Sequence, residues 1–161
     1  MSVQQLDSAV LAFEAARAID STQSQILYML GGLYGGTKRH AEAADMLERL
    51  IVLAGPEVEL IAIAADEHAE AGDTAQAIQR YEDYRALDPF DEYPLVKLSQ
   101  IYAATHRMDE ACAMQRSLAA MHPTSYGHVL SAVRMHIEAD LWREADTMLQ
   151  RYFAADSLTD Q

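Results

Sequence analysis

A period of 34 residues runs through most of this 161-residue chain. It shows first in a column of alanines, at Ala43, Ala77, Ala111 and Ala145. Two further columns keep the same phase, one of large apolar residues and one of planar rings: Leu27, Ile61, Leu95 and Val129, then Tyr34, His68, Tyr102 and His136. A fixed period of this length is typical of a chain built from repeated supersecondary units. We therefore expect an array in which each unit buries its apolar face against the next.

Each unit is expected to contain two helices, because apolar residues recur every three or four positions. Polar turns such as Glu70-Ala71-Gly72-Asp73 separate the helices, and Asp73 is a good N-cap with Gln76 as its capping-box partner. Gly55-Pro56 and Asp88-Pro89 end second helices, since proline cannot continue a helix. The expected helices are 4–20, 23–36, 40–54, 57–70, 74–87, 92–104, 108–121, 125–138 and 141–154. The fold class is therefore all-α, a helix-turn-helix repeat solenoid without strands.

The pattern resembles the tetratricopeptide repeat (TPR) family. The resemblance rests on the period, the small residues Gly31, Ala65 and Ser99 in the first helix, the alanine in the second, and the closing proline. It is strongest from Ala71 to Pro89 and departs at Gln115, a normally apolar place. It implies a right-handed superhelix with a concave inner face, as a single domain over residues 1–161. That domain would hold an N-terminal half repeat, 1–22, and four repeats, 24–57, 58–91, 92–125 and 126–159.

Composition excludes several classes of partner. Asp and Glu number 25 against 12 Lys and Arg, a net charge of −13, so the chain repels a phosphate backbone and no nucleic-acid partner is expected. A single cysteine, Cys112, excludes an internal disulfide framework. No apolar run approaches the ~20 residues that span a bilayer, and no cationic-then-apolar leader is visible. We therefore expect a cytoplasmic protein without a membrane partner.

The histidines do not form a metal or catalytic pattern. A ligand set on a helix needs side chains three or four residues apart, whereas Asp66 and Glu67 directly precede His68 and point to other faces. His68 and His136 are expected as packed rings, and His106 and His122 as solvated turn residues. Cys112 is expected to be a buried, inert thiol. No nucleophile or nucleotide motif is present, so we expect no enzyme activity, no metal and no cofactor.

A glycine-rich helix, Gly31-Gly32-Leu33-Tyr34-Gly35-Gly36, breaks a local rule, because each glycine costs a helix roughly 0.5–1 kcal/mol relative to alanine. Such places are often functional. Two explanations stay open: the segment admits a partner helix or peptide, or it packs tightly on the N-terminal helix.

The TPR resemblance implies that the first helix of each unit lines the inner face. By register, the partner-binding residues are Gln25, Tyr28, Gly32, Gly35, Ala62, Asp66, Ala69, Glu70, Val96, Gln100, Ala103, Leu130, Arg134 and Ile137. This lining is mostly small or apolar, which suits an amphipathic helix or an apolar extended segment. The alternative is that these residues pack between units. An acidic run from Glu57 to Asp73 either steers a basic partner or is a solvated face.

The last helix carries more apolar residues than one buried stripe needs. Trp142, Tyr152 and Phe153 are expected to form a C-terminal contact surface, because repeat arrays usually end in a polar cap and none is visible here. This favours a homodimer or a stable complex with another protein.

The leading hypothesis is a non-catalytic module that holds a peptide or amphipathic helix of a protein partner in its groove. In size, acidity and groove character the chain resembles the small type III secretion chaperones, which implies an aggregation-prone client. The alternative is a structural adaptor subunit that docks through its C-terminal helix.

Overall fold

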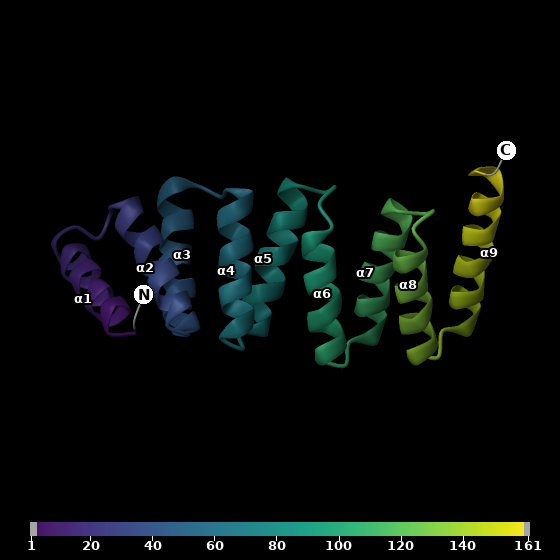
Figure 1. Ribbon diagram of the computed structural model, residues 1–161, viewed down its shortest axis with the longest axis horizontal. Coiled ribbons are helices and arrows are strands. Elements are labelled where there is room, and N and C mark those ends of the chain that lie inside the picture. The colour runs from purple at the N-terminus through teal and green to yellow at the C-terminus, as the bar shows by residue number, and fades with distance from the viewer. Residues whose placement is uncertain (1–2, 160–161) are drawn as a thin grey trace. The chain divides into compact units, whose positions relative to one another are not determined.

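The computed structural model describes residues 3–159, apart from the side chains of 3–5, 7 and 155–159. Every regular element in this part of the chain is an α-helix (Figure 1). The helices are α1 (Val3–Ile19), α2 (Ser24–Gly36), α3 (His40–Ala54), α4 (Val58–Glu70), α5 (Thr74–Leu87), α6 (Tyr93–Ala104), α7 (Met108–Met121), α8 (Tyr126–Glu138) and α9 (Trp142–Thr159). The all-α prediction is confirmed, and the largest difference is that α9 ends at Thr159 rather than at residue 154.

The turn inside each repeat has one conformation, although its sequence varies. Lys38, Gly72, His106 and Asp140, spaced by 34 residues, all have positive φ, between 59° and 80°. The next residue donates its backbone N–H to the carbonyl of the ring residue: Arg39 to Tyr34, Asp73 to His68, Arg107 to Tyr102 and Leu141 to His136, at 2.8–2.9 Å. This bond caps the first helix of each pair. Asp73 also caps α5 as predicted, because its Oδ1 accepts from the Gln76 amide at 3.2 Å.

The chain divides into two compact units at Asp88 and Pro89. Unit 1 contains α1 to α5 and unit 2 contains α6 to α9, and within each unit every helix packs on the next. The four repeats and the half repeat as one domain stay a prediction. The outermost residues of that predicted domain, 1–2 and 160–161, lie outside the described part.

Small side chains bring paired helices together, as the repeat pattern predicts. The four alanines of the 34-residue column are buried, and Ala65 and Ser99 are equally covered. At Gly31 an added Cβ would lie 3.1 Å from Leu47 Cγ, so α2 and α3 are already at contact distance. Leu27, Leu30 and Tyr81 fill the core of unit 1, and Leu98 and Leu118 that of unit 2.

None of the described helices has both the length and the apolar content needed to cross a membrane.

Candidate functional site

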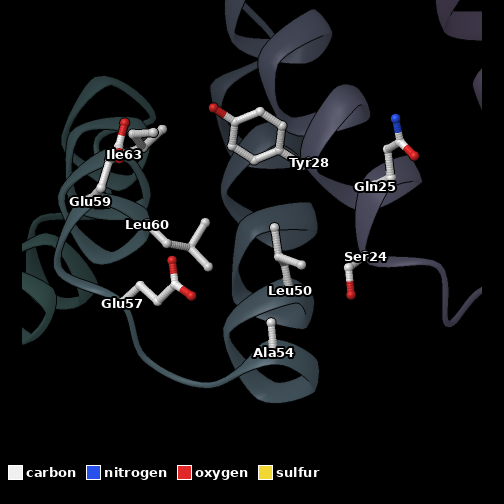
Figure 2. Close-up of a pocket in the computed structure, with 9 residues that line it drawn as sticks. All are labelled: Ser24, Gln25, Tyr28, Leu50, Ala54, Glu57, Glu59, Leu60 and Ile63. Atoms are coloured by element: carbon white, nitrogen blue, oxygen red, sulfur yellow. The ribbon is translucent and has the colours of Figure 1, made fainter.

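Unit 1 contains a pocket of about 320 Å³ that opens between α2 and α4, with the C-terminal half of α3 at its base. Its apolar lining is Tyr28 from α2, Leu50 from α3, and Leu60 and Ile63 from α4. Figure 2 shows the Tyr28 ring next to Leu50, with Leu60 pointing toward α3 from the opposite side. We call this the α2–α4 pocket.

The α2–α4 pocket has a covered base and an uncovered wall. Leu50 and Leu60 are buried, whereas the Tyr28 side chain is 51% exposed and Ile63 is half-buried. An apolar side chain placed here would bury its own surface together with that of Tyr28. Burying a residue the size of leucine or valine contributes about 1.5–3 kcal/mol.

The rim of the α2–α4 pocket is acidic. Glu57 and Glu59 lie on the α4 side in Figure 2, opposite Ser24 and Gln25 on α2. Both glutamates are exposed, and no lysine or arginine lines the pocket. The pocket therefore favours an apolar group flanked by a basic one.

Unit 2 contains a wider pocket of about 690 Å³ between α6 and α8, above α7. Its lining is mostly polar or small and comes from all three helices and the turn before α8: Val96, Ser99, Gln100, Ala103, Gln115, Leu118, Ser125, Gly127, His128, Ser131, Arg134, Met135 and Glu138. This α6–α8 pocket offers amide and hydroxyl groups rather than an apolar base. The expectation of a mostly small or apolar lining is therefore wrong for this pocket.

Two departures from the repeat pattern meet in the α6–α8 pocket. Gln115, at a normally apolar position, donates from Nε2 to Ser99 Oγ at 2.8 Å, and Ser99 donates to the Val96 carbonyl at 3.2 Å. Each residue satisfies the polar group of the other, so both are tolerated at the helix crossing.

The predicted groove residues lie at several places. Gln25 and Tyr28 line the α2–α4 pocket. Val96, Gln100, Ala103 and Arg134 line the α6–α8 pocket. The other predicted residues lie outside both pockets: Gly32, Gly35, Ala62, Asp66, Ala69, Glu70, Leu130 and Ile137. Of these, Asp66 is already engaged, because the Tyr81 hydroxyl donates to its Oδ1 at 2.5 Å. Their role in binding stays a prediction.

The register argument missed the pocket residues that come from second helices and from neighbouring faces. Leu50 and Leu118, at the bases of the two pockets, are 68 residues apart, two repeat periods, and are both bulky. Their shared phase was a signal, but it did not distinguish a residue at the base of a pocket from a residue of the core.

The glycine-rich segment is explained in part by packing, against α3 and α4 rather than α1. Gly31 faces Leu47 of α3, and an added Cβ at Gly35 would overlap the Glu67 carboxylate of α4. That carboxylate lies 2.8 Å from His40 Nδ1. Gly32 and Gly36 have open space around them, so nothing in the fold requires glycine there.

The prediction that His122 is merely solvated is wrong. Its ring stacks on His128 with centroids 4.8 Å apart, and its Nε2 lies 2.5 Å from Glu92 Oε1. His128 Nε2 lies 3.2 Å from the other oxygen of Glu92. A turn position did not reveal this cluster because Glu92 precedes the helix before it. His106, in contrast, is exposed as predicted.

The remaining histidines and the cysteine are structural. His136 is fully buried and its Nδ1 lies 2.7 Å from the Ala132 carbonyl, and His68 Nε2 lies 3.1 Å from Glu48 Oε1. Cys112 is buried, and this burial raises the pKa of its thiol above the ordinary value. Among the side chains that the structure describes, no group of three His, Cys, Asp or Glu is arranged to hold a metal ion.

The predicted C-terminal contact surface lies on α9. Trp142 and Phe153 are 58% and 63% exposed, whereas Tyr152 is half-buried. Tyr152 packs on the core cluster of α8 and α9 and lies near two rings, Tyr126 at 6.0 Å and Phe153 at 5.6 Å between centroids. Its role in binding stays a prediction.

No family model matches the sequence, and no curated protein matches it. Solved structures do resemble it. A crystal structure of a MamA protein aligns with a TM-score of 0.72 at 18% identity, over 96% of this chain and 84% of that chain. YrrB, described as a TPR protein with an unusual peptide-binding site, aligns with a TM-score of 0.68 at 18% identity, over 94% and 78%. MamA from Desulfovibrio magneticus RS-1 aligns with a TM-score of 0.67 at 12% identity, over 97% and 88%.

These likenesses show the fold. The chain has a TPR-like helical-repeat fold, as the 34-residue period predicts.

Proposed function

We propose that this chain is a non-catalytic protein-interaction module that holds an apolar segment of a protein partner in the α2–α4 pocket. The observation that carries the proposal is the half-exposed Tyr28 ring beside the apolar base formed by Leu50 and Leu60. A large exposed ring next to an open hollow is unfavourable in water and becomes favourable when a ligand covers it. The similar fold of YrrB, a protein described as having a peptide-binding site, supports this class of function.

The acidic rim defines the partner further. Glu57 and Glu59 would attract a lysine or arginine next to the apolar anchor, so the partner segment carries both. An amphipathic helix and an extended strand both meet this description. The α6–α8 pocket, with its amide and hydroxyl groups, would accept the backbone or polar side chains of a peptide. A cytoplasmic chaperone that shields an aggregation-prone client is one function that such a module can serve.

Cross-linking at Tyr28 tests the proposal directly. A photoreactive phenylalanine placed at position 28 in the native host should capture a protein partner, and the same group at the neighbouring exposed Met29, which does not line the pocket, should not. The captured partner is then identified by mass spectrometry and purified.

Affinity for that partner provides the second arm. Ile63→Asp places a buried-side charge in the pocket and should weaken binding about tenfold or more, whereas Met29→Ala should leave the dissociation constant unchanged. Equal capture at positions 28 and 29, or full affinity of the Ile63→Asp variant, would contradict the proposal.

A second candidate function rests on the exposure of Trp142 and Phe153. An adaptor that docks through α9 should lose its complex, or its self-association, in the Trp142→Ala and Phe153→Ala variants while the Ile63→Asp variant keeps it. Sedimentation velocity on the three variants, alone and with the captured partner, distinguishes the two functions.

A further inference from the structure

Unit 2 has a second hollow, on residues that none of the α6–α8 pocket shares. It has a volume of about 410 Å³ and lies between α7 and α9 over the start of α8. Its lining is mostly apolar, with two arginines: Ala119, Ala120, Pro123, Val129, Met148 and Tyr152, with Arg116 and Arg151. We call it the α7–α9 hollow.

The matching seam in unit 1 is closed by ion pairs. The residues 68 positions before Arg116, Met148 and Arg151 are Glu48, Arg80 and Asp83. Arg80 lies between two carboxylates there: Nε and Nη2 donate to Glu48 at 2.7 and 2.5 Å, and Nη1 donates to Asp83 at 2.8 Å. A central cation with an anion on each side thus joins α3 to α5.

In unit 2 the outer charges are reversed and the central charge is missing. Arg116 and Arg151 replace the two acids, and the neutral Met148 replaces Arg80. Charge complementarity at this seam would be restored by an anion at the centre, which this chain does not supply at the equivalent position.

Neither arginine has an acidic partner nearby on its own helix. Six other arginines, in both units, form ion pairs with an acid three or four residues away: Arg39, Arg49, Arg80, Arg85, Arg107 and Arg134. Arg116 and Arg151 have no Asp or Glu at those spacings, and within the described part of the chain neither forms an ion pair. In a chain with 25 acids and 12 bases, two such arginines beside one hollow are a distinct feature.

We propose that the α7–α9 hollow binds an amphipathic helix of a partner protein and that the helix places an acidic side chain between Arg116 and Arg151. The apolar lining requires an apolar face on the occupant, and guanidinium groups bind a carboxylate in a planar, two-bond geometry. A nucleic acid fits poorly, because it lacks that apolar face and the chain as a whole repels it. The inference goes beyond the proposed function, since it concerns other residues and the opposite charge preference.

A pair of synthetic peptides tests this inference. One is a fluorescein-labelled helix of about 18 residues, long enough to fold, with leucines three and four residues apart and one glutamate among them. The other carries glutamine in place of that glutamate. Fluorescence anisotropy with the full chain at low salt should show about tenfold tighter binding of the glutamate peptide.

Variants of the chain assign that preference to the hollow. Arg116→Gln combined with Arg151→Gln should remove it, and so should Met148→Glu, which supplies the missing carboxylate from within the chain. Arg143→Gln, an exposed arginine of α9 outside the hollow, should keep it. Ile63→Asp should keep it as well, so failure of this inference and failure of the proposed function are distinguishable.

Three results would overturn the inference: equal binding of the two peptides, no binding of either, or an unchanged preference in the double arginine variant. Self-association of the chain that disappears in the double arginine variant without any peptide would also overturn it, because the occupant would then be a second copy.

Discussion

The α2–α4 and α6–α8 pockets are the same place in the repeat, two periods apart, with different chemistry. Both lie between first helices, above a second helix, and both have a leucine at the base, Leu50 or Leu118. The positions around that leucine differ: Tyr28 corresponds to Val96, Leu60 to His128, and Ile63 to Ser131. The repeat constrains the residues that hold the helices together and leaves the pocket lining free to vary, so one scaffold carries an apolar site and a polar site.

The helix crossings beneath the two pockets differ in the same way. Gly31 meets Leu47 in unit 1, and the corresponding pair in unit 2 is Ser99 and Gln115, which are joined by a hydrogen bond. A larger polar pair thus replaces a small apolar pair. This exchange is possible because both members changed together.

Core substitutions should have the largest effect, and an equal one in both units. Leu30→Ala and Leu98→Ala change fully buried leucines that are 68 residues apart, and each should lower the free energy of unfolding by about 2–5 kcal/mol. Urea unfolding followed by circular dichroism measures this, with exposed Met29→Ala as the control. A loss below about 1 kcal/mol at one site would show that the two crossings are not equivalent.

The ion-pair seam of unit 1 should have the next largest effect. Arg80→Met copies the residue found at position 148 and leaves the partly buried Glu48 without its guanidinium, which should cost about 1–3 kcal/mol of unfolding free energy. Arg49→Met breaks an exposed pair with Asp45 and should cost less than about 0.5 kcal/mol. Equal losses in the two variants would refute the contrast between the seams.

The Ser99–Gln115 pair should show coupling of about 1 kcal/mol. Gln115→Leu alone crowds the Ser99 side chain and removes its donor, and Ser99→Gly alone leaves the Gln115 amide unpaired and adds a helix glycine. The double variant recreates the glycine–leucine pair of unit 1 and should lose less than the sum of the single losses by at least about 0.5 kcal/mol. Additive losses in a urea double-mutant cycle would mean that the two exchanges are independent.

The smallest effect concerns a surface motif that is the same in both units. Arg39 pairs with Glu42 and stacks on Tyr34, and Arg107 pairs with Glu110 and stacks on Tyr102. Hydrogen bonds from these arginines lower the pKa of both carboxyl groups below the ordinary value of 4.5. A lowered pKa in the folded state stabilises the protein above the unfolded pKa, and the contribution disappears as pH falls through the folded pKa.

Glu42→Gln and Glu110→Gln should therefore shift the urea midpoint slightly and equally at pH 7, and not at pH 3. A shift that persists at pH 3 would mean that the side-chain amide, rather than the lost charge, changes stability.

Most of the fold could be predicted from the sequence, because the period, the alanine column and the capping of α5 by Asp73 are local or periodic signals. Less of the site could. Tyr28 followed from its register, but Leu60 and Ile63 did not, because nothing in one helix tells which side chains face a neighbour. The Glu92–His122–His128 cluster and the overlap between Gly35 and Glu67 depend on residues 27 or more positions apart that only packing brings together.

The sequence by itself determined the helices, their pairing and the residues at each crossing, since these depend on spacing that repeats every 34 residues. The tertiary structure alone decided which hollows remain open and what lines them. A pocket is the space that the side chains of three helices leave unfilled, and its volume and polarity depend on their combined sizes and directions. The contrast between an apolar pocket, a polar pocket and an arginine-flanked hollow is therefore a property of the packed chain.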